Sequence, residues 1–94
     1  MSDKLGDALD EFYKVYRKLQ KNTKVRMKSH FAERTDGYIE IWSYQGNAKE
    51  KLLVKVTAEA DEENGETQCY AKAADFVRNI LKEQEEQQDQ RAAG

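Results

Sequence analysis

Proline is absent from this 94-residue chain, and cysteine, histidine and tryptophan each occur once. The single cysteine, Cys69, excludes a disulfide framework within the chain and suits a reducing compartment. No apolar stretch approaches the roughly 18 residues of a membrane-spanning helix, and no basic segment followed by an apolar run indicates a secretory signal peptide. We therefore expect a soluble cytosolic or nuclear protein, with the cytoplasm as its predicted location.

Sequence signatures of catalysis and metal binding are missing as well. The chain contains no glycine-rich phosphate loop, no zinc-ligand spacing and no nucleophile elbow. Cys69 falls on the apolar stripe of a predicted helix, where a thiol acts as a small hydrophobic residue. Five carboxylates between Glu59 and Glu66 lack the ligand spacing of an EF-hand loop, which favours a solvated acidic loop. We expect no enzymatic activity, no cofactor and no metal.

The chain is short and strongly charged, with 38% hydrophobic and 36% charged residues and a net charge of −2. At about 2 kcal/mol for each buried side chain, such a core only modestly exceeds the ordering entropy of the backbone. A partner that covers one face would help, so we expect a homodimer or heterodimer. The negative net charge disfavours indiscriminate nucleic-acid binding, but it allows a polarised surface.

The pattern of apolar residues predicts five elements. Spacing of three and four residues predicts a helix over residues 3–21. Period-two alternation predicts strands over 24–31, 38–44 and 51–58, and short loops with Asp36-Gly37 and Gly46-Asn47 make neighbouring strands antiparallel. A second helix is predicted to begin near Thr67. The residues that it is expected to bury are Cys69, Tyr70, Ala73, Ala74, Phe76, Val77, Ile80 and Leu81.

This α-β-β-β-α order predicts an α+β fold of one domain, over residues 1–82. Two helices on one face of a three-stranded antiparallel sheet would bury both helical stripes and one sheet face together. The apolar period stops after Leu81, and residues 83–94 are polar. We expect that segment to be a frayed C-terminal tail, because it has nothing to bury.

The other face of the sheet is predicted to be basic and aromatic. Successive strand side chains point to opposite faces, so Leu52, Val54, Val56 and Ala58 should point inward. Of the charged residues expected outside, only Glu40 is acidic, against five bases. The candidates for contact with nucleic acid on this outer face are Lys24, Arg26, Lys28, His30, Trp42, Tyr44, Lys51 and Lys55.

This outer face is open to three interpretations. Aromatic rings stack on unpaired bases while lysine and arginine neutralise phosphates, so RNA binding without enzymatic activity is one. A second is an ordinary solvated face, where lysines guard the sheet against edge pairing. A third is a protein-interaction module, an adaptor or inhibitor, that docks its partner on Trp42, Tyr44 and Leu53, since aromatic residues dominate protein hot spots.

In layout, the chain resembles the two small Alu-domain subunits of the eukaryotic signal recognition particle. The likeness covers most of residues 5–82 and rests on Asp10-Glu11-Phe12 early in the first helix, Lys24 to Lys28 as strand one, Asp36-Gly37 in the first hairpin, and a closing helix from Lys72 to Leu81. The resemblance implies a dimeric ribonucleoprotein component whose joined sheet holds folded RNA. It also implies phosphate contacts from Lys24, Arg26, Lys28, Lys51 and Lys55.

Overall fold

The computed structural model describes residues 4–32, 34–44 and 49–93, with side chains described as far as residue 86. The elements are α1 (Lys4–Asn22), β1 (Val25–His30), β2 (Gly37–Ser43), β3 (Lys51–Ala58) and α2 (Gly65–Ala93). The strands form one antiparallel sheet in the order β1-β2-β3. The predicted α-β-β-β-α fold is therefore confirmed. The expected turn at Gly46-Asn47 lies outside the described residues.

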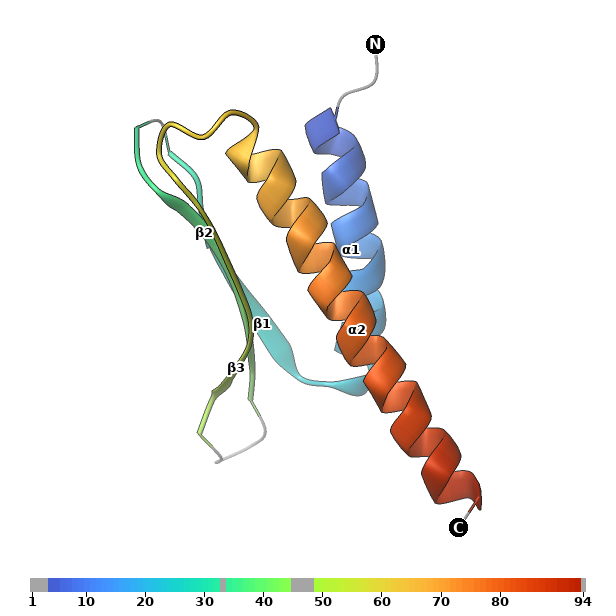
Figure 1. The fold of residues 1–94 in the computed structure, drawn as a ribbon. Coiled ribbons are helices and arrows are strands. Elements are labelled where there is room, and N and C mark those ends of the chain that lie inside the picture. The colour runs from blue at the N-terminus through green and yellow to red at the C-terminus, as the bar shows by residue number, and fades with distance from the viewer. Residues whose placement is uncertain (1–3, 33, 45–48, 94) are drawn as a thin grey trace.

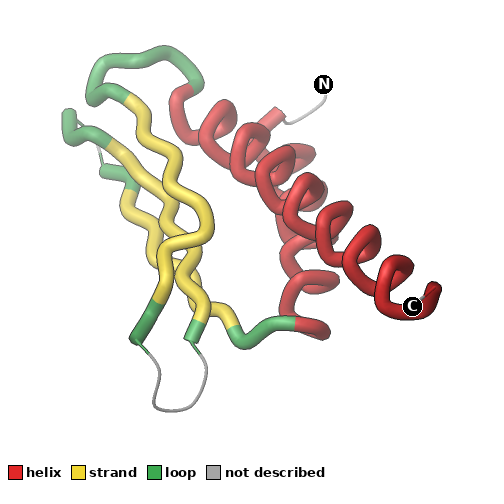
Figure 2. Tube along the Cα trace, turned by 60° about the horizontal axis from the view of Figure 1, so that its bottom comes forward, coloured by secondary structure: helices red, strands yellow, loops and turns green. Residues whose placement is uncertain are grey.

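The two helices lie side by side in one layer and the sheet forms the other (Figures 1 and 2). The core fills the space between the layers, because the apolar stripes of the helices and the inward positions of the strands have no other surface to cover. Every element contributes to it. The buried residues are Phe12, Val15, Tyr16, Leu19, Val25, Ile39, Ile41, Val54, Val56, Ala58, Cys69, Tyr70, Ala73, Ala74 and Val77.

Aromatic rings join the helices to the sheet at one end of the core. The ring of Phe12 lies 5.5 Å from that of Tyr16 and 5.4 Å from that of Tyr70, between centroids. Tyr70 also meets Phe31, which follows β1, at 5.7 Å. The Phe31 ring covers the backbone of Gly37, where a Cβ atom would come within 2.4 Å of Phe31 Cδ1. Gly37 is therefore required by close packing of a side chain on its backbone.

A β-bulge in β3 overturns part of the expected strand orientation. Ile41 pairs with Val54 but Trp42 pairs with Leu52, so Leu53 is an extra residue on β3. Leu53 and Val54 both point toward the core, and Leu52 is 39% exposed on the opposite face. The prediction that Leu52 points inward was wrong, because the inserted residue reverses the alternation before it.

Helix α2 differs from expectation in its packing. Phe76 is 50% exposed, so the prediction that it is buried was wrong; Ala73 and Val77 occupy the buried stripe in its place. The helix begins at Gly65 and continues without a break past residue 82 to Ala93. Gln84, in the segment expected to be a tail, donates a hydrogen bond from Nε2 to Thr23 Oγ1 at 2.9 Å. Fraying of the residues beyond it stays a prediction.

Candidate nucleic-acid interface

The sheet face that the helices leave uncovered has a defined set of side chains, aligned by the strand register. Directly paired residues in an antiparallel sheet point to the same face. Three rows cross the strands: Arg26-Trp42-Leu52, Lys28-Glu40-Lys55 and His30-Tyr38-Thr57. Their neighbours along each strand, such as Ile39 and Val54, are buried under the helices. We call the nine residues of these three rows the open face.

Ion pairs reduce the positive charge of the open face. Arg26 Nη2 lies 2.7 Å from Glu50 Oε1, and Lys55 Nζ lies 3.9 Å from Glu40 Oε2. Lys28 has no ion pair within the described residues. Three bases therefore stand against Glu40 on the face and Glu50 beside it. Sequence periodicity missed Glu50, because it precedes β3 and belongs to no alternating segment.

Three rings lie among these charges. His30 and Tyr38 are cross-strand neighbours, with ring centroids 6.2 Å apart. Trp42 is half-buried between its neighbours Arg26 and Leu52 on the adjacent strands. Its indole Nε1 is covered and has no hydrogen-bond partner in the described part of the chain, so only the ring surface is available to a ligand. Aromatic and basic side chains thus share one surface of the sheet.

Three of the expected contact residues lie outside the open face. Lys51 pairs with Ser43, which pairs with the buried Val25, so its predicted orientation was wrong for the same reason as that of Leu52. Lys24 and Tyr44 lie just outside the strands, joined by a 2.9 Å hydrogen bond from Tyr44 N to Lys24 O. Tyr44 lies near α1: the pKa of Tyr16 is raised, first by burial and then by the phenols of Tyr13 and Tyr44.

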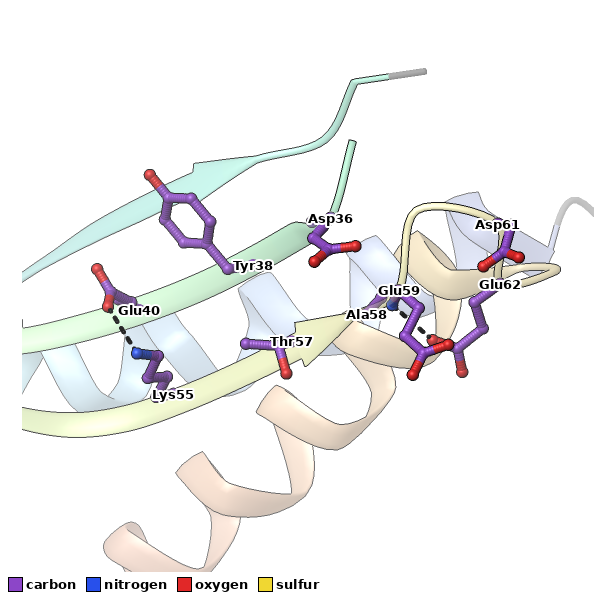
Figure 3. Close-up of a pocket in the computed structure, with 10 residues that line it drawn as sticks. Asp36, Tyr38, Glu40, Lys55, Thr57, Ala58, Glu59, Asp61 and Glu62 are labelled. Atoms are coloured by element: carbon purple, nitrogen blue, oxygen red, sulfur yellow. Dashed lines mark hydrogen bonds and ion pairs between the residues drawn. The ribbon is translucent and has the colours of Figure 1, made fainter. Parts of the chain in front are cut away.

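One end of the open face adjoins an acidic hollow (Figure 3). Tyr38, Glu40, Lys55 and Thr57 line its sheet side, and Asp36 before β2 and the loop after β3 supply its other carboxylates. Two of the loop contacts are structural: Asp36 Oδ1 accepts a hydrogen bond from Ala60 N at 2.8 Å, and Glu62 Oε2 accepts one from Glu59 N at 3.2 Å. The carboxylates that surround the hollow are Asp36, Glu40, Glu59, Asp61 and Glu62. On the side of the loops, the hollow therefore carries an excess of negative charge.

The structure offers no other chemical centre among the residues that it describes. No group of three or more histidine, cysteine, aspartate or glutamate side chains in that part of the chain could hold a metal ion. Burial raises the pKa of the Cys69 thiol, with a smaller contribution from Glu62. A buried thiol in its neutral form is a poor nucleophile. No helix in the described ranges combines the length and the apolar character needed to cross a membrane.

Comparisons of this chain with protein-family models, with curated proteins and with solved structures found no match. The functional assignment therefore rests on the residues themselves.

Proposed function

We propose that this protein binds RNA on the open face without enzymatic activity, and that the RNA lies there as an unpaired strand. The observation that carries the proposal is the register of that face: Arg26 pairs directly with Trp42, and Lys28 and Lys55 occupy the next row. Rings that accept any base by stacking, next to cations for the backbone, are the usual components of a single-strand platform.

The ion pairs on this face are compatible with phosphate binding. The side chain of Arg26 is 50% exposed and that of Lys55 is 56% exposed. Exposed pairs contribute about 0–1 kcal/mol, so a phosphate can replace Glu50 or Glu40 at little cost. Beyond Lys55 the acidic hollow restricts the path, because a backbone that continues toward the loop after β3 would meet the carboxylates of Glu59, Asp61 and Glu62. The strand should therefore run over the Arg26 and Lys28 rows.

Fluorescence of Trp42, the only tryptophan, tests the proposal directly. Adding single-stranded RNA at low salt should change the emission, and anisotropy of labelled RNA should give the affinity independently. The three bases of the open face should contribute about −2.1 to the slope of log affinity against log salt, from about −0.7 for each phosphate contact. Trp42→Ala should weaken binding by about 1–3 kcal/mol if a base stacks there.

Matched variants separate stacking and charge from general damage. Trp42→Phe should retain most of the affinity, because it keeps a ring. Lys28→Glu should weaken binding strongly, whereas Lys72→Glu makes the same charge change at an exposed position of α2, away from the open face. Equal losses from the two lysine variants, or no binding by either method, would reject the open face as an RNA site.

Protein docking is the second candidate, and one observation favours it. The bulge brings Leu52 to the open face beside Trp42, where it is 39% exposed. The apolar contact expected at Leu53 is absent, because that side chain packs against the core. A partner protein held by Trp42 and Leu52 would bind with little dependence on salt, in contrast to RNA.

The resemblance to the Alu-domain subunits of the signal recognition particle extends the proposal without being tested by the comparisons. It adds a partner chain that continues the sheet, and folded RNA as the ligand. A cytoplasmic location follows from the same proposal and stays a prediction.

A further inference from the structure

A groove of about 490 Å³ runs between α1 and α2, and both of its walls belong to the helical layer. It does not border the open face, since no residue of the sheet lines it. Its apolar floor includes Val15 and Leu81. The charged residues that line it are Glu11, Lys14, Lys18, Lys21, Arg78, Lys82 and Glu85. Five of these are basic and two are acidic.

Internal ion pairs occupy only one end of this groove. Arg78 bonds to Glu11 across the two helices and to Asp75 Oδ1 at 2.7 Å on its own helix. Within the described residues, no ion pair involves the four lysines of the groove. Arg78 is the main cause that lowers the pKa of Glu11, and Lys14 and Lys18 add to it, as expected where positive charge is in excess. Four lysines are left against Glu85.

Helix electrostatics explain only half of this excess. Lys18 and Lys21 lie near the C-terminal end of α1, where cations favour the helix dipole. Lys14 lies in the middle of α1, and Lys82 lies well before the end of α2 at Ala93. The α1 lysines recur at four and three residues, so they form a row about 10 Å long on one side of the helix. Such a row matches a ligand with several negative charges in line.

We propose that this helix groove is a second RNA contact, in which the four lysines bind successive phosphates of the backbone. The inference takes its kind of ligand, RNA, from the proposed function. The site itself is argued from the residues of the groove. Lysine binds phosphate as a point charge without demanding one orientation, which suits a backbone that is contacted along a row. None of the described residues that line the groove is aromatic, so the groove would hold phosphates and leave base stacking to the open face.

Two double variants test the groove. Lys18→Gln with Lys82→Gln removes one lysine from each wall, and Lys4→Gln with Lys72→Gln removes the same charge from exposed positions outside both surfaces. Binding of a single-stranded RNA should show a salt slope less steep by about 1.4 for the groove variant, from about 0.7 for each lost contact. The control variant should keep the slope of the parent chain. Urea unfolding confirms that both variants fold.

Amide chemical shifts locate the ligand. RNA should shift the amides of residues 14–22 and 78–85 in the parent chain, and should still shift them when Trp42→Ala and Lys28→Gln weaken the open face. Groove shifts that disappear with the open-face variant, or equal slopes for the two lysine variants, would overturn the inference and leave the proposed function standing. If the groove variants lose RNA binding and the open-face variants keep it, the open face is rejected as the RNA site. Binding of polyglutamate as tight as that of RNA would reject phosphate as the ligand chemistry.

Discussion

Gly37 is the residue whose replacement the packing opposes most clearly. A Cβ atom there would lie 2.4 Å from Cδ1 and 2.6 Å from Cε1 of Phe31, well inside van der Waals contact. Gly37→Ala must therefore displace a ring that also meets Tyr70. We expect a loss of about 1–3 kcal/mol in the free energy of unfolding, as for other overpacked sites. Urea denaturation of the two chains measures it.

A double-mutant cycle identifies the cause of that loss. Phe31→Leu removes the ring that blocks the new methyl group, so its combination with Gly37→Ala should cost less than the sum of the single changes. Strict additivity would show that Gly37→Ala acts through the backbone and not through the ring.

Three buried acids make the fold sensitive to high pH. Burial is the first cause that raises the pKa of Tyr16, Tyr70 and the Cys69 thiol above their ordinary values of 10.0, 10.0 and 9.0. The unfolded chain loses these protons at lower pH than the folded chain, so stability is intact below the ordinary values and falls as pH rises through them. Urea midpoints should be equal at pH 7 and 8 and lower above pH 10.

Tyr16→Phe provides the control for this prediction. The variant lacks one of the three titrating groups and should lose less stability between pH 8 and pH 10.5 than the parent chain. An equal or greater loss would mean that other groups govern alkaline unfolding.

At the scale of elements, the alternation of apolar residues was sufficient where each strand stays regular. Alternation alone allowed either face for β2, and the cost of burying Glu40 decided it; Ile39 and Ile41 are buried as expected, as are Val54 and Val56 at the end of β3. The segment Leu52-Leu53 was ambiguous, because either leucine can point inward and the bulge that decides between them depends on pairing with Trp42. Consequently, sequence reasoning identified Arg26, Lys28 and Lys55 on the open face but placed Lys51 and Leu52 wrongly.

The continuation of α2 includes a contact that periodicity does not reveal. Gln84 is a polar residue beyond the last apolar position, yet it reaches Thr23 at the junction of α1 and β1. A glutamine that bonds to a distant threonine has the same sequence pattern as one that faces solvent. The same limit explains why Glu50 was missed as the partner of Arg26.

Truncation of α2 tests the contribution of this contact. A chain that ends at Glu86 keeps Gln84, and a chain that ends at Glu83 loses it. We expect the shorter chain to be less stable by about 0.5–1.5 kcal/mol, the usual net value of a hydrogen bond. Removal of residues 87–94 should cost under about 0.5 kcal/mol, as for other polar surface segments. A cost of several kcal/mol for that removal would mean that the end of the helix packs against a partner.

At the scale of the whole molecule, opposite charges are separated in space although the net charge is only −2. The open face and the helix groove each carry more bases than acids, and five carboxylates surround the acidic hollow. An average over the chain hides this separation, so the negative net charge does not oppose binding of phosphate at the two basic surfaces. Bound RNA should therefore lie on the two basic surfaces and avoid the acidic hollow.

Self-association should respond to salt in the direction opposite to RNA binding. The strand order leaves β1 and β3 with one free edge each, and an edge is where a second copy could continue the sheet. Arg26 and Lys28 lie on β1, and Lys55 lies on β3, so two copies that join at these edges bring like charges together. Salt screens that repulsion. Sedimentation equilibrium at high micromolar concentration should therefore show a monomer at low salt and an increasing share of dimer as salt rises.

Lys28→Glu should promote the dimer at low salt by placing a carboxylate near Lys55 of the second copy, and Lys72→Glu should not. A chain that stays monomeric at every salt concentration, with either variant, would leave the two edges for a different partner chain.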